Sequence, residues 1–385
     1  MFREVKSDIG FDMYVTLIDD GQIFVTVNMQ KIDLNIQEIY YNILCKVSNI
    51  FTEHGMALFH ERIFGSQNLY DEIIEIRNRS EFFHNSPFTY IQGNPYWGIG
   101  IAGIHFHGVE STHYYVENVI HNKTPIGTKW VSSQAEFIIL HSLHGSEKKD
   151  PYRNTLTMFD EAKALLQHQG FSIKDVVRTW IYLDKILSQY DDFNKARNSK
   201  FKEFGLIPEK VNEERGFEQI YLPASTGIDG SNHFGVSGVM DLLAIKAKDS
   251  STMIGNETGQ EQKAAYRYGS AFSRSMIIKH GKVNYIYLSG TASIGEDGKS
   301  KYIGDINKQI EKTVDVIKAL IKKENISFNE MIEGTIFIKD ASFADIFISY
   351  CKKNEINDLP FFMTIADVCR DDLLFEIDAT FVSTC

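Results

Sequence analysis

The feature that most restricts the fold of this chain is an internal repeat, in which an amphipathic helix ends at a small residue and an apolar strand follows. The pattern occurs in residues 35–65, 158–184 and 310–340. Its apolar residues recur first at helical spacing and then in a run of β-branched and aromatic residues. Each helix stops at a residue that tolerates the left-handed conformation of a C-cap, and these residues are Gly55, Gly170 and Asn325. The repeat predicts a chain built by duplication of one unit.

The second and third copies match beyond the helix and strand. A strand that runs into a glycine turn precedes each copy, and a second helix and an end strand follow it. The matching segments are residues 129–145 and 281–298, 193–201 and 343–353, and 240–247 and 373–379. Each unit thus reads strand, helix, strand, helix, strand. This order predicts an α+β fold with mixed sheets and helices packed on one face.

The repeat predicts two domains in the 385 residues, although a chain of this length has room for two or three units. Residues 1–250 form the N-terminal domain, in which residues 1–120 diverge from the repeat, and residues 265–385 form the C-terminal domain. The join at residues 250–265 is polar, contains glycine and lacks periodicity, which is typical of a linker or surface loop.

Charge and composition restrict the partners. A net charge of −11 without a long basic run argues against nucleic acid or an anionic membrane. The sequence has no apolar stretch suited to a signal peptide or a membrane span, so we expect a cytoplasmic protein. The four cysteines lack the spacing of a disulfide framework or zinc site. His105 and His107 alternate along a strand and are expected to share a face rather than bind a metal.

One acidic residue breaks the pattern of the last strand. Leu373, Phe375, Ile377, Ala379 and Phe381 occupy one predicted face, and Glu376 lies on the other. With the end strands aligned so that Ile245 meets Ile377 and Ala247 meets Ala379, Glu376 faces Ala244 in the earlier copy. A glutamate found in one copy is not required by the fold. If it is buried, desolvation raises its pKa and makes it a candidate general acid; an exposed or lysine-paired glutamate is the alternative.

Further polar residues are candidates for binding an anion. Ser225, Thr226 and Gly227 are predicted to form a turn whose backbone N–H groups face a ligand, although an ordinary loop fits the same residues. Arg197 on a helix and Arg274 before a strand suit a dicarboxylate, and each also suits a surface ion pair.

Two other segments supply candidate residues. Tyr266 and Tyr268 either line a pocket or pack against the protein. The small residues of 289–294 allow a ligand to approach the backbone closely. Cys369 is by default a small buried residue.

The combined motifs resemble a known family. The unit with YLSGTASI, GDINKQIEKTVDVIKALI (residues 304–321) and EIDA is similar to the RidA/YjgF fold. The longer set VVRTWIYL, FNKARN, YLPASTGI, AFSR, SGTASI and DVCRDDLLFEIDA resembles the chorismatases, two-unit RidA-like enzymes also labelled pteridine-dependent deoxygenases. The resemblance covers about residues 129–385, and it rests on the order of the motifs rather than on any one of them.

The resemblance implies cleavage of chorismate to pyruvate without cofactor or metal. Glu376 matches the family's catalytic glutamate, and Arg197 and Arg274 then bind the two carboxylates of chorismate. Family members differ in product, which is a dihydroxycyclohexadiene carboxylate, 3-hydroxybenzoate or also 4-hydroxybenzoate. The cysteine at position 369 resembles the hydroxybenzoate-forming members, and Ala292 is the candidate for a second residue that varies with product.

Two other function classes stay open. A RidA-type deaminase of 2-imino acids carries an arginine before the end strand, where this chain has Phe361 and Phe362. A non-catalytic ligand-binding protein of the same fold is the third reading. The resemblance places the site where units meet, leaves a homo-oligomer open, and does not identify the pathway that uses the product.

Overall fold

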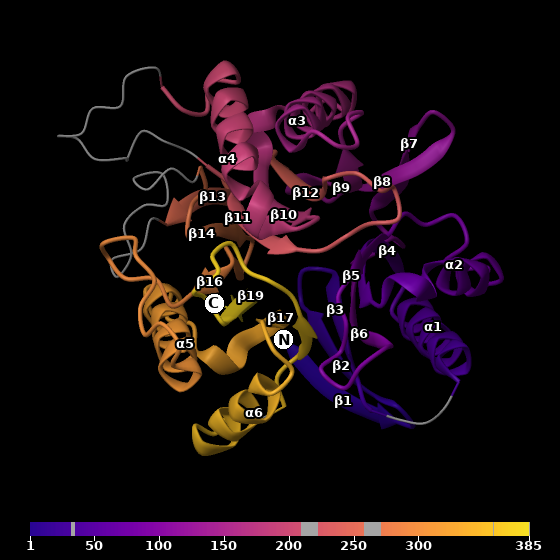
Figure 1. Cartoon of the computed structure of the whole chain (residues 1–385). Coiled ribbons are helices and arrows are strands. Elements are labelled where there is room, and N and C mark those ends of the chain that lie inside the picture. Colours follow the sequence, from indigo (N-terminus) through magenta and orange to yellow (C-terminus); the bar gives the residue numbers. More distant parts are fainter. Residues whose placement is uncertain (32–34, 209–221, 258–270, 357, 385) are drawn as a thin grey trace.

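The computed structural model describes residues 1–31, 35–208, 222–257, 271–356 and 358–384. Within these residues the strands form three mixed sheets, and each sheet carries two α-helices on one face (Figure 1). We call each sheet with its two helices the first, second and third unit in chain order. The predicted α+β class with repeated units is confirmed.

The elements of each unit follow one order along the chain. The first unit contains β1 (Phe2–Asp8), β2 (Phe11–Ile18), β3 (Gln22–Met29), α1 (Ile36–Glu53), β4 (Met56–Gly65), α2 (Tyr70–Asn78), β5 (Thr89–Gln92) and β6 (Ile101–Glu110). The second contains β7 (Tyr115–His121), β8 (Thr124–Val131), β9 (Ala135–His144), α3 (Pro151–His168), β10 (Val176–Leu183), α4 (Ile186–Glu203), β11 (Ala224–Asp229) and β12 (Gly238–Ala247). The third contains β13 (Thr252–Glu257), β14 (Ser275–His280), β15 (Val283–Leu288), β16 (Thr291–Ala292), α5 (Ile306–Lys322), β17 (Met331–Ile338), α6 (Phe343–Lys353), β18 (Phe361–Ile365) and β19 (Phe375–Thr384).

The strand order is the same in the three sheets. It is β1-β2-β3-β6-β4-β5 in the first, β7-β8-β9-β12-β10-β11 in the second and β13-β14-β15-β19-β17-β18 in the third, where β16 also pairs with β19. The end strand of each unit therefore lies in the middle of its sheet, between a meander and the strand that follows the first helix. Residues 1–250, which the sequence predicts as one domain, contain two of these sheets, and the division into domains stays a prediction.

The predicted helix caps are confirmed by the backbone. Gly55, Gly170 and Asn325 have φ angles of +64°, +80° and +56°. The predicted linker is wrong in part, because residues 252–257 form β13 and pair with β14. This strand lacks an apolar pattern because it lies at the edge of its sheet, and residues 258–265 lie outside the described part of the chain. Among the described helices, none combines the length and the apolarity that crossing a membrane requires.

Apolar packing holds each unit together and then joins the units. One cluster of buried side chains fills the space between each sheet and its helices. Phe375, Ile377, Ala379 and Phe381 belong to the cluster beneath α5 and α6, which confirms these four residues of the predicted apolar face. The fifth, Leu373, precedes β19 and packs in the central cluster instead. The opposite faces of the sheets meet in a central cluster that draws on all of the units, so the helices lie on the outside (Figure 1).

Polar pairs cross each junction between units at matching positions. His60, Arg178 and Glu333 each follow a β-bulge, in β4, β10 and β17. His60 Nε2 lies 3.0 Å from Asp241 Oδ2, Arg178 donates to Asp378 over 2.7 Å, and Glu333 lies 4.0 Å from Nδ1 of His105. The pairs run from the first unit to the second, from the second to the third, and from the third to the first. They therefore close the three units into a ring.

The register corrects the alignment of the end strands. Glu376 pairs with Phe337 of β17. Counted from the β-bulge of each unit, the matching position in β12 is Val239, which pairs with Tyr182. In β6 it is Gly103, which pairs with Phe64. The predicted match of Glu376 with Ala244 is therefore wrong. Apolar strands align equally well at several shifts, and the bulges that set the true shift leave no mark in the sequence. Among these three matching strand positions only that of the third unit is acidic.

Candidate active site

Glu376 is buried on β19. It has 4% of its surface exposed and lies opposite Ala292 of β16 in the pairing register. Burial raises the pKa of Glu376 to about 8; the charge of Asp378 adds to the shift, and Arg274 and Arg178 oppose it. Of the two alternatives that the sequence left open, a buried and an exposed glutamate, the structure shows the buried one, with the raised pKa expected for that case. Its catalytic role stays a prediction.

Gly290 makes room for this carboxyl group. It follows β15, and a Cβ atom at this position would lie 2.1 Å from Oε1 of Glu376 and 3.2 Å from Cγ2 of Thr226. A side chain therefore cannot be added without displacing the carboxyl group. The small residues of 289–294 were predicted to let a ligand approach the backbone. At Gly290 the group that approaches the backbone is the carboxyl group of Glu376.

A buried arginine, Arg178, fixes two residues next to Glu376 by hydrogen bonds. Arg178 on β10 donates to Asp378 Oδ1 over 2.7 Å and to Thr226 Oγ1 over 2.6 Å. Asp378 stands two residues after Glu376 on the same face of β19. The second unit thus fixes the carboxylate whose charge helps to keep Glu376 protonated.

The two predicted arginines meet at Phe272. The guanidinium of Arg197 lies 5.7 Å from the Phe272 ring centroid and that of Arg274 lies 5.3 Å from it. Arg197 comes from α4 of the second unit and donates to Asn194 over 2.6 Å, while Arg274 precedes β14 of the third. Both side chains are 2% exposed. Buried arginines from two units suit an anionic ligand better than a surface ion pair.

The predicted turn around Ser225 is wrong. Ala224–Asp229 form β11, which pairs in parallel with β10. The backbone N–H of Ser225 donates to Ser289 Oγ over 2.7 Å, and the hydroxyl of Thr226 accepts from Arg178. The apolar partners that make this segment a strand lie on β10, far away in sequence. Ser225 and Gly227 line the cavity beside Glu376 as part of that strand.

Cys369 lies at the same cavity and is partly exposed. Burial raises the pKa of its thiol to about 12, and the charge of Glu376 adds to the shift. The Tyr190 hydroxyl of α4 interacts with this thiol. Cys369 is therefore a neutral thiol rather than a thiolate nucleophile.

The cavity joins most of the predicted residues with several that the sequence did not single out. The lining residues are Tyr190, Arg197, Ser225, Gly227, Phe272, Arg274, Gly290, Ile294, Cys369, Arg370 and Glu376. Thr226 and Ala292 are buried beside it, and Tyr268 lies outside the described residues. The additional residues are Tyr190, Phe272, Gly290, Ile294 and Arg370. Phe272, Gly290, Ile294 and Arg370 lie within the motifs AFSR, SGTASI and DVCRDDLLFEIDA, but only Gly290 had a reason of its own, the small-residue run, because the others are ordinary side chains until the units meet.

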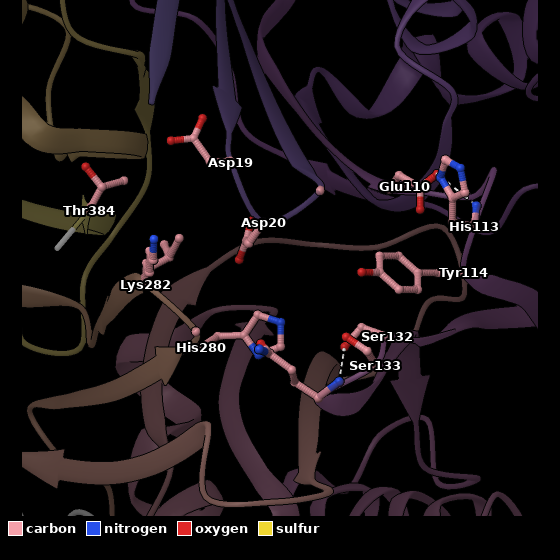
Figure 2. Close-up of a pocket in the computed structure, with 14 residues that line it drawn as sticks. Asp19, Asp20, Glu110, His113, Tyr114, Ser132, Ser133, His280, Lys282 and Thr384 are labelled. Carbon is pink, nitrogen blue, oxygen red and sulfur yellow. Dashed lines mark hydrogen bonds and ion pairs between the residues drawn. The ribbon is translucent and has the colours of Figure 1, made fainter.

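A larger and more open pocket lies elsewhere, where hairpin turns of the three units converge. Asp19 and Asp20 of the first unit, Ser132 of the second and Lys282 of the third surround it (Figure 2). Its groups are mixed in charge. Among the described residues that line it, none is a predicted site residue. We therefore take the smaller cavity around Glu376 as the candidate active site.

The two histidines that were considered as metal ligands have other partners. His105 contacts Thr26 through Nδ1 at 3.0 Å and Thr335 through Nε2 at 2.9 Å. His107 contacts Gln22 through Nε2 at 2.9 Å and stacks on Phe24. These contacts explain why both histidines are buried.

Comparison with known proteins adds to this geometry. No protein-family model matches the chain. Over 82 residues, which are 21% of this chain, it is 28% identical to a RutC family protein of Pyrococcus abyssi. The chain spans 58% of that protein's length.

The solved structures include one that matches almost the whole chain. A chorismatase crystal structure has a TM-score of 0.60, covers 95% of this chain and 100% of its own, and is 14% identical. A YjgF family protein from Neisseria meningitidis covers 36% of this chain and 99% of its own, with a TM-score of 0.27 and 12% identity. Yeast Mmf1 covers 34% and 100%, with a TM-score of 0.28 and 18% identity. The first match confirms, at the level of the fold, the resemblance that the motifs predicted.

Proposed function

Because the chain has the fold of a chorismatase, we propose that it cleaves chorismate and releases pyruvate. The observation that carries the proposal is Glu376, a buried carboxyl group with a raised pKa in a cavity that two arginines also line. Chorismate is a dicarboxylate with an enol ether. The residues of the cavity match both features.

Glu376 acts as the general acid. An enol ether breaks after its methylene carbon is protonated, and a carboxyl group that keeps its proton near neutral pH supplies that proton. The oxocarbenium ion that forms is captured by water or by the hydroxyl group of its own ring. Arg197 and Arg274 bind the carboxylates and hold the enol ether toward Glu376.

Substrate binding requires side chains to move. The cavity has a volume of about 40 Å³, which is room for a few water molecules. Tyr190, Arg197 and Arg370 line it with long side chains that have rotamers to exchange. We expect these side chains rather than the strands to shift when a ring enters.

The first test measures pyruvate release from chorismate by the wild type and by Glu376→Gln. Glutamine keeps the shape of the side chain and lacks the transferable proton, so we expect turnover to fall by about 10²–10⁴. Asp371→Asn serves as the control, because Asp371 is an exposed residue of the preceding turn. Release from the variant near the wild-type rate would remove Glu376 from the mechanism. Lack of release by the folded wild type would leave a deaminase or a non-catalytic binding protein.

We further propose that the product is mainly 3-hydroxybenzoate, with 4-hydroxybenzoate as a minor product. The neutral thiol of Cys369 occupies the cavity wall and is less hydrated than a hydroxyl group, so it excludes the water that would otherwise capture the oxocarbenium ion. Capture by the ring hydroxyl gives a cyclic ketal, and loss of a ring proton with cleavage of one ring C–O bond of the ketal then makes the ring aromatic. The remaining hemiketal separates into the hydroxybenzoate and pyruvate with no net gain or loss of water.

The second test replaces Cys369 with alanine and separates the products by chromatography against standards. We expect a shift toward the dihydroxycyclohexadiene carboxylate while pyruvate release continues, because Glu376 still supplies the proton. Cys369→Ser is the matched comparison, because it keeps the size of the side chain but replaces the thiol with a more hydrated hydroxyl group, and we expect it to shift the product toward the diol as well. A wild type that yields only the diol would contradict the role of Cys369 and leave that of Glu376 intact.

A further inference from the structure

A second buried cluster of functional groups lies outside the candidate active site, at the junction of the first and second units. It consists of His60 on β4, His141 on β9 and Asp241 on β12, with exposed fractions of 5%, 4% and 0%. One ligand atom from each residue lies within 4.8 Å of the other two. None of these residues lines the cavity around Glu376.

The two oxygens of the Asp241 carboxylate have different partners. Its Oδ1 accepts from Thr89 Oγ1 over 2.6 Å and from the backbone N–H of Ser142 over 2.8 Å. Its Oδ2 lies 3.0 Å from Nε2 of His60. One oxygen is thus fixed by hydrogen bonds, and the other lies beside the imidazole of His60.

Among the described residues, none forms a hydrogen bond of normal geometry with Nε2 of His141, although the Phe59 carbonyl lies beside the ring. Its Nδ1 lies 3.3 Å from Thr89 Oγ1, whose own proton is donated to Asp241. The Thr89 oxygen therefore accepts from Nδ1, and Nε2 carries a lone pair. Nε2 is buried without a hydrogen bond in the part of the chain that the structure describes. A buried polar atom without a partner calls for a bound group.

The junction of the second and third units has a pair at the matching position, and it differs from this cluster in the partner of its aspartate. Asp378 is paired with Arg178, which carries a permanent charge. His60 takes the matching position beside Asp241, with Nε2 3.0 Å from Oδ2. The carboxylate of Asp241 thus meets an imidazole, a metal-ligand group, in the place where Asp378 meets a guanidinium.

We propose that His60, His141 and Asp241 bind a divalent first-row transition metal ion, for which Zn²⁺ is the best match. Imidazole and carboxylate are ligands that Zn²⁺ accepts, at about 2.0–2.2 Å, which separates neighbouring ligand atoms by about 3.3 Å in a tetrahedral site. Thr89 supplies the outer hydrogen bonds that orient Asp241 and His141. The ion joins β4 to β9 and β12 and takes no part in the reaction at Glu376.

The proposal is tested first on the wild-type protein. The protein is treated with chelator in mild urea, refolded with or without Zn²⁺, freed of excess ion and measured by elemental analysis and thermal unfolding. We expect one Zn²⁺ per chain and a higher Tm for the metal-loaded sample. Co²⁺ in place of Zn²⁺ should give the visible absorption bands of a tetrahedral site. Wild-type protein that retains only a small fraction of an equivalent, with an unchanged Tm, would overturn the proposal.

Variants then locate the ion. We expect His141→Gln and Asp241→Asn each to lower the bound Zn²⁺ at least tenfold and to abolish the Co²⁺ bands, while His107→Gln retains both. His107 is a matched control because it is also buried but bonds to Gln22. Equal metal content in the wild type and in the folded His141→Gln variant would overturn the assignment. The ring proton of His141 would then point toward the Phe59 carbonyl, which lies beside the ring.

Discussion

At the scale of single residues, Glu376 shows how burial sets the chemistry of a carboxyl group. Its pKa is raised to about 8 although Arg274 and Arg178 lower it, so desolvation and the charge of Asp378 outweigh two cations. Arg178 is engaged with Asp378, which weakens its effect on Glu376. The site keeps a proton on Glu376 and still has positive charge for the substrate.

The pH dependence of the reaction follows from this pKa. Chorismate cleavage should proceed at a constant rate at neutral pH and fall as the pH rises through about 8, because the acid is then lost. The residual activity of Glu376→Gln should lack this step. Initial rates of pyruvate release from pH 6 to pH 10 test the prediction. A wild-type rate that is flat through pH 9 would contradict it.

The free energy of unfolding should also change with pH, because the folded state binds the proton of Glu376 more tightly than the unfolded state does. The folded pKa of Glu376 lies above its ordinary value of 4.5, so its contribution to stability is complete below about pH 4.5 and is lost as the pH rises through about 8. Glutamine does not ionise, so Glu376→Gln should not lose stability as the pH rises. Urea unfolding at pH 9 should therefore show the variant more stable than the wild type by roughly 1–4 kcal/mol, with a smaller difference at pH 5.

At the scale of elements, the site depends on a close approach between β19 and the segment after β15. Gly290 lies where any Cβ atom would meet Oε1 of Glu376. Burial of β19 in the middle of its sheet prevents the strand from moving away. The carboxyl group would have to rotate instead, toward a different part of the cavity.

We expect Gly290→Ala to fold and to lose at least about 10²-fold in chorismate turnover, because a misplaced acid no longer reaches the enol ether. Gly255→Ala on β13 is the control, since a Cβ atom there meets nothing within 4 Å. Pyruvate release and far-UV circular dichroism of both variants provide the measurement. Normal turnover in folded Gly290→Ala would show that the position of Glu376 tolerates a shift.

At the scale of the whole molecule, three units close on one another within a single chain, and charged side chains occupy their shared core. Arg62 on β4 bonds to Glu333 of the third unit and lies 3.8 Å from Asp378. Its guanidinium also stacks 4.6 Å from the ring centroid of Trp180 in the second unit. One side chain of the first unit thus contacts both of the others.

Replacing this side chain should weaken the whole assembly. Arg62→Met leaves Glu333 buried without its cation, which costs about 3–5 kcal/mol of unfolding free energy in comparable cases. Arg79→Met is the control, because Arg79 and its partner Glu75 are exposed and such pairs contribute about 1 kcal/mol or less. Urea unfolding of the wild type and both variants measures the change in unfolding free energy. Equal stability of Arg62→Met and wild type would mean that the central ion pairs are dispensable.

The sequence by itself determined the repeating units, because apolar periodicity and left-handed caps are local properties of the chain. It also singled out Glu376, since a carboxylate in an apolar strand stands out without any structure. The segments that line the candidate site were recognised as motifs in chain order, although the pairing of the end strands and the turn at Ser225 were wrong.

Tertiary structure alone decided which units touch and how. The register depends on β-bulges, the strand at Ala224–Asp229 depends on its partner β10, and the meeting of Arg197 with Arg274 depends on the junction of two units. The cluster of His60, His141 and Asp241 has the same origin, because its members stand on three strands of two units. Such contacts arise from burial between distant segments, and burial is a property of the assembled chain rather than of any stretch of its sequence.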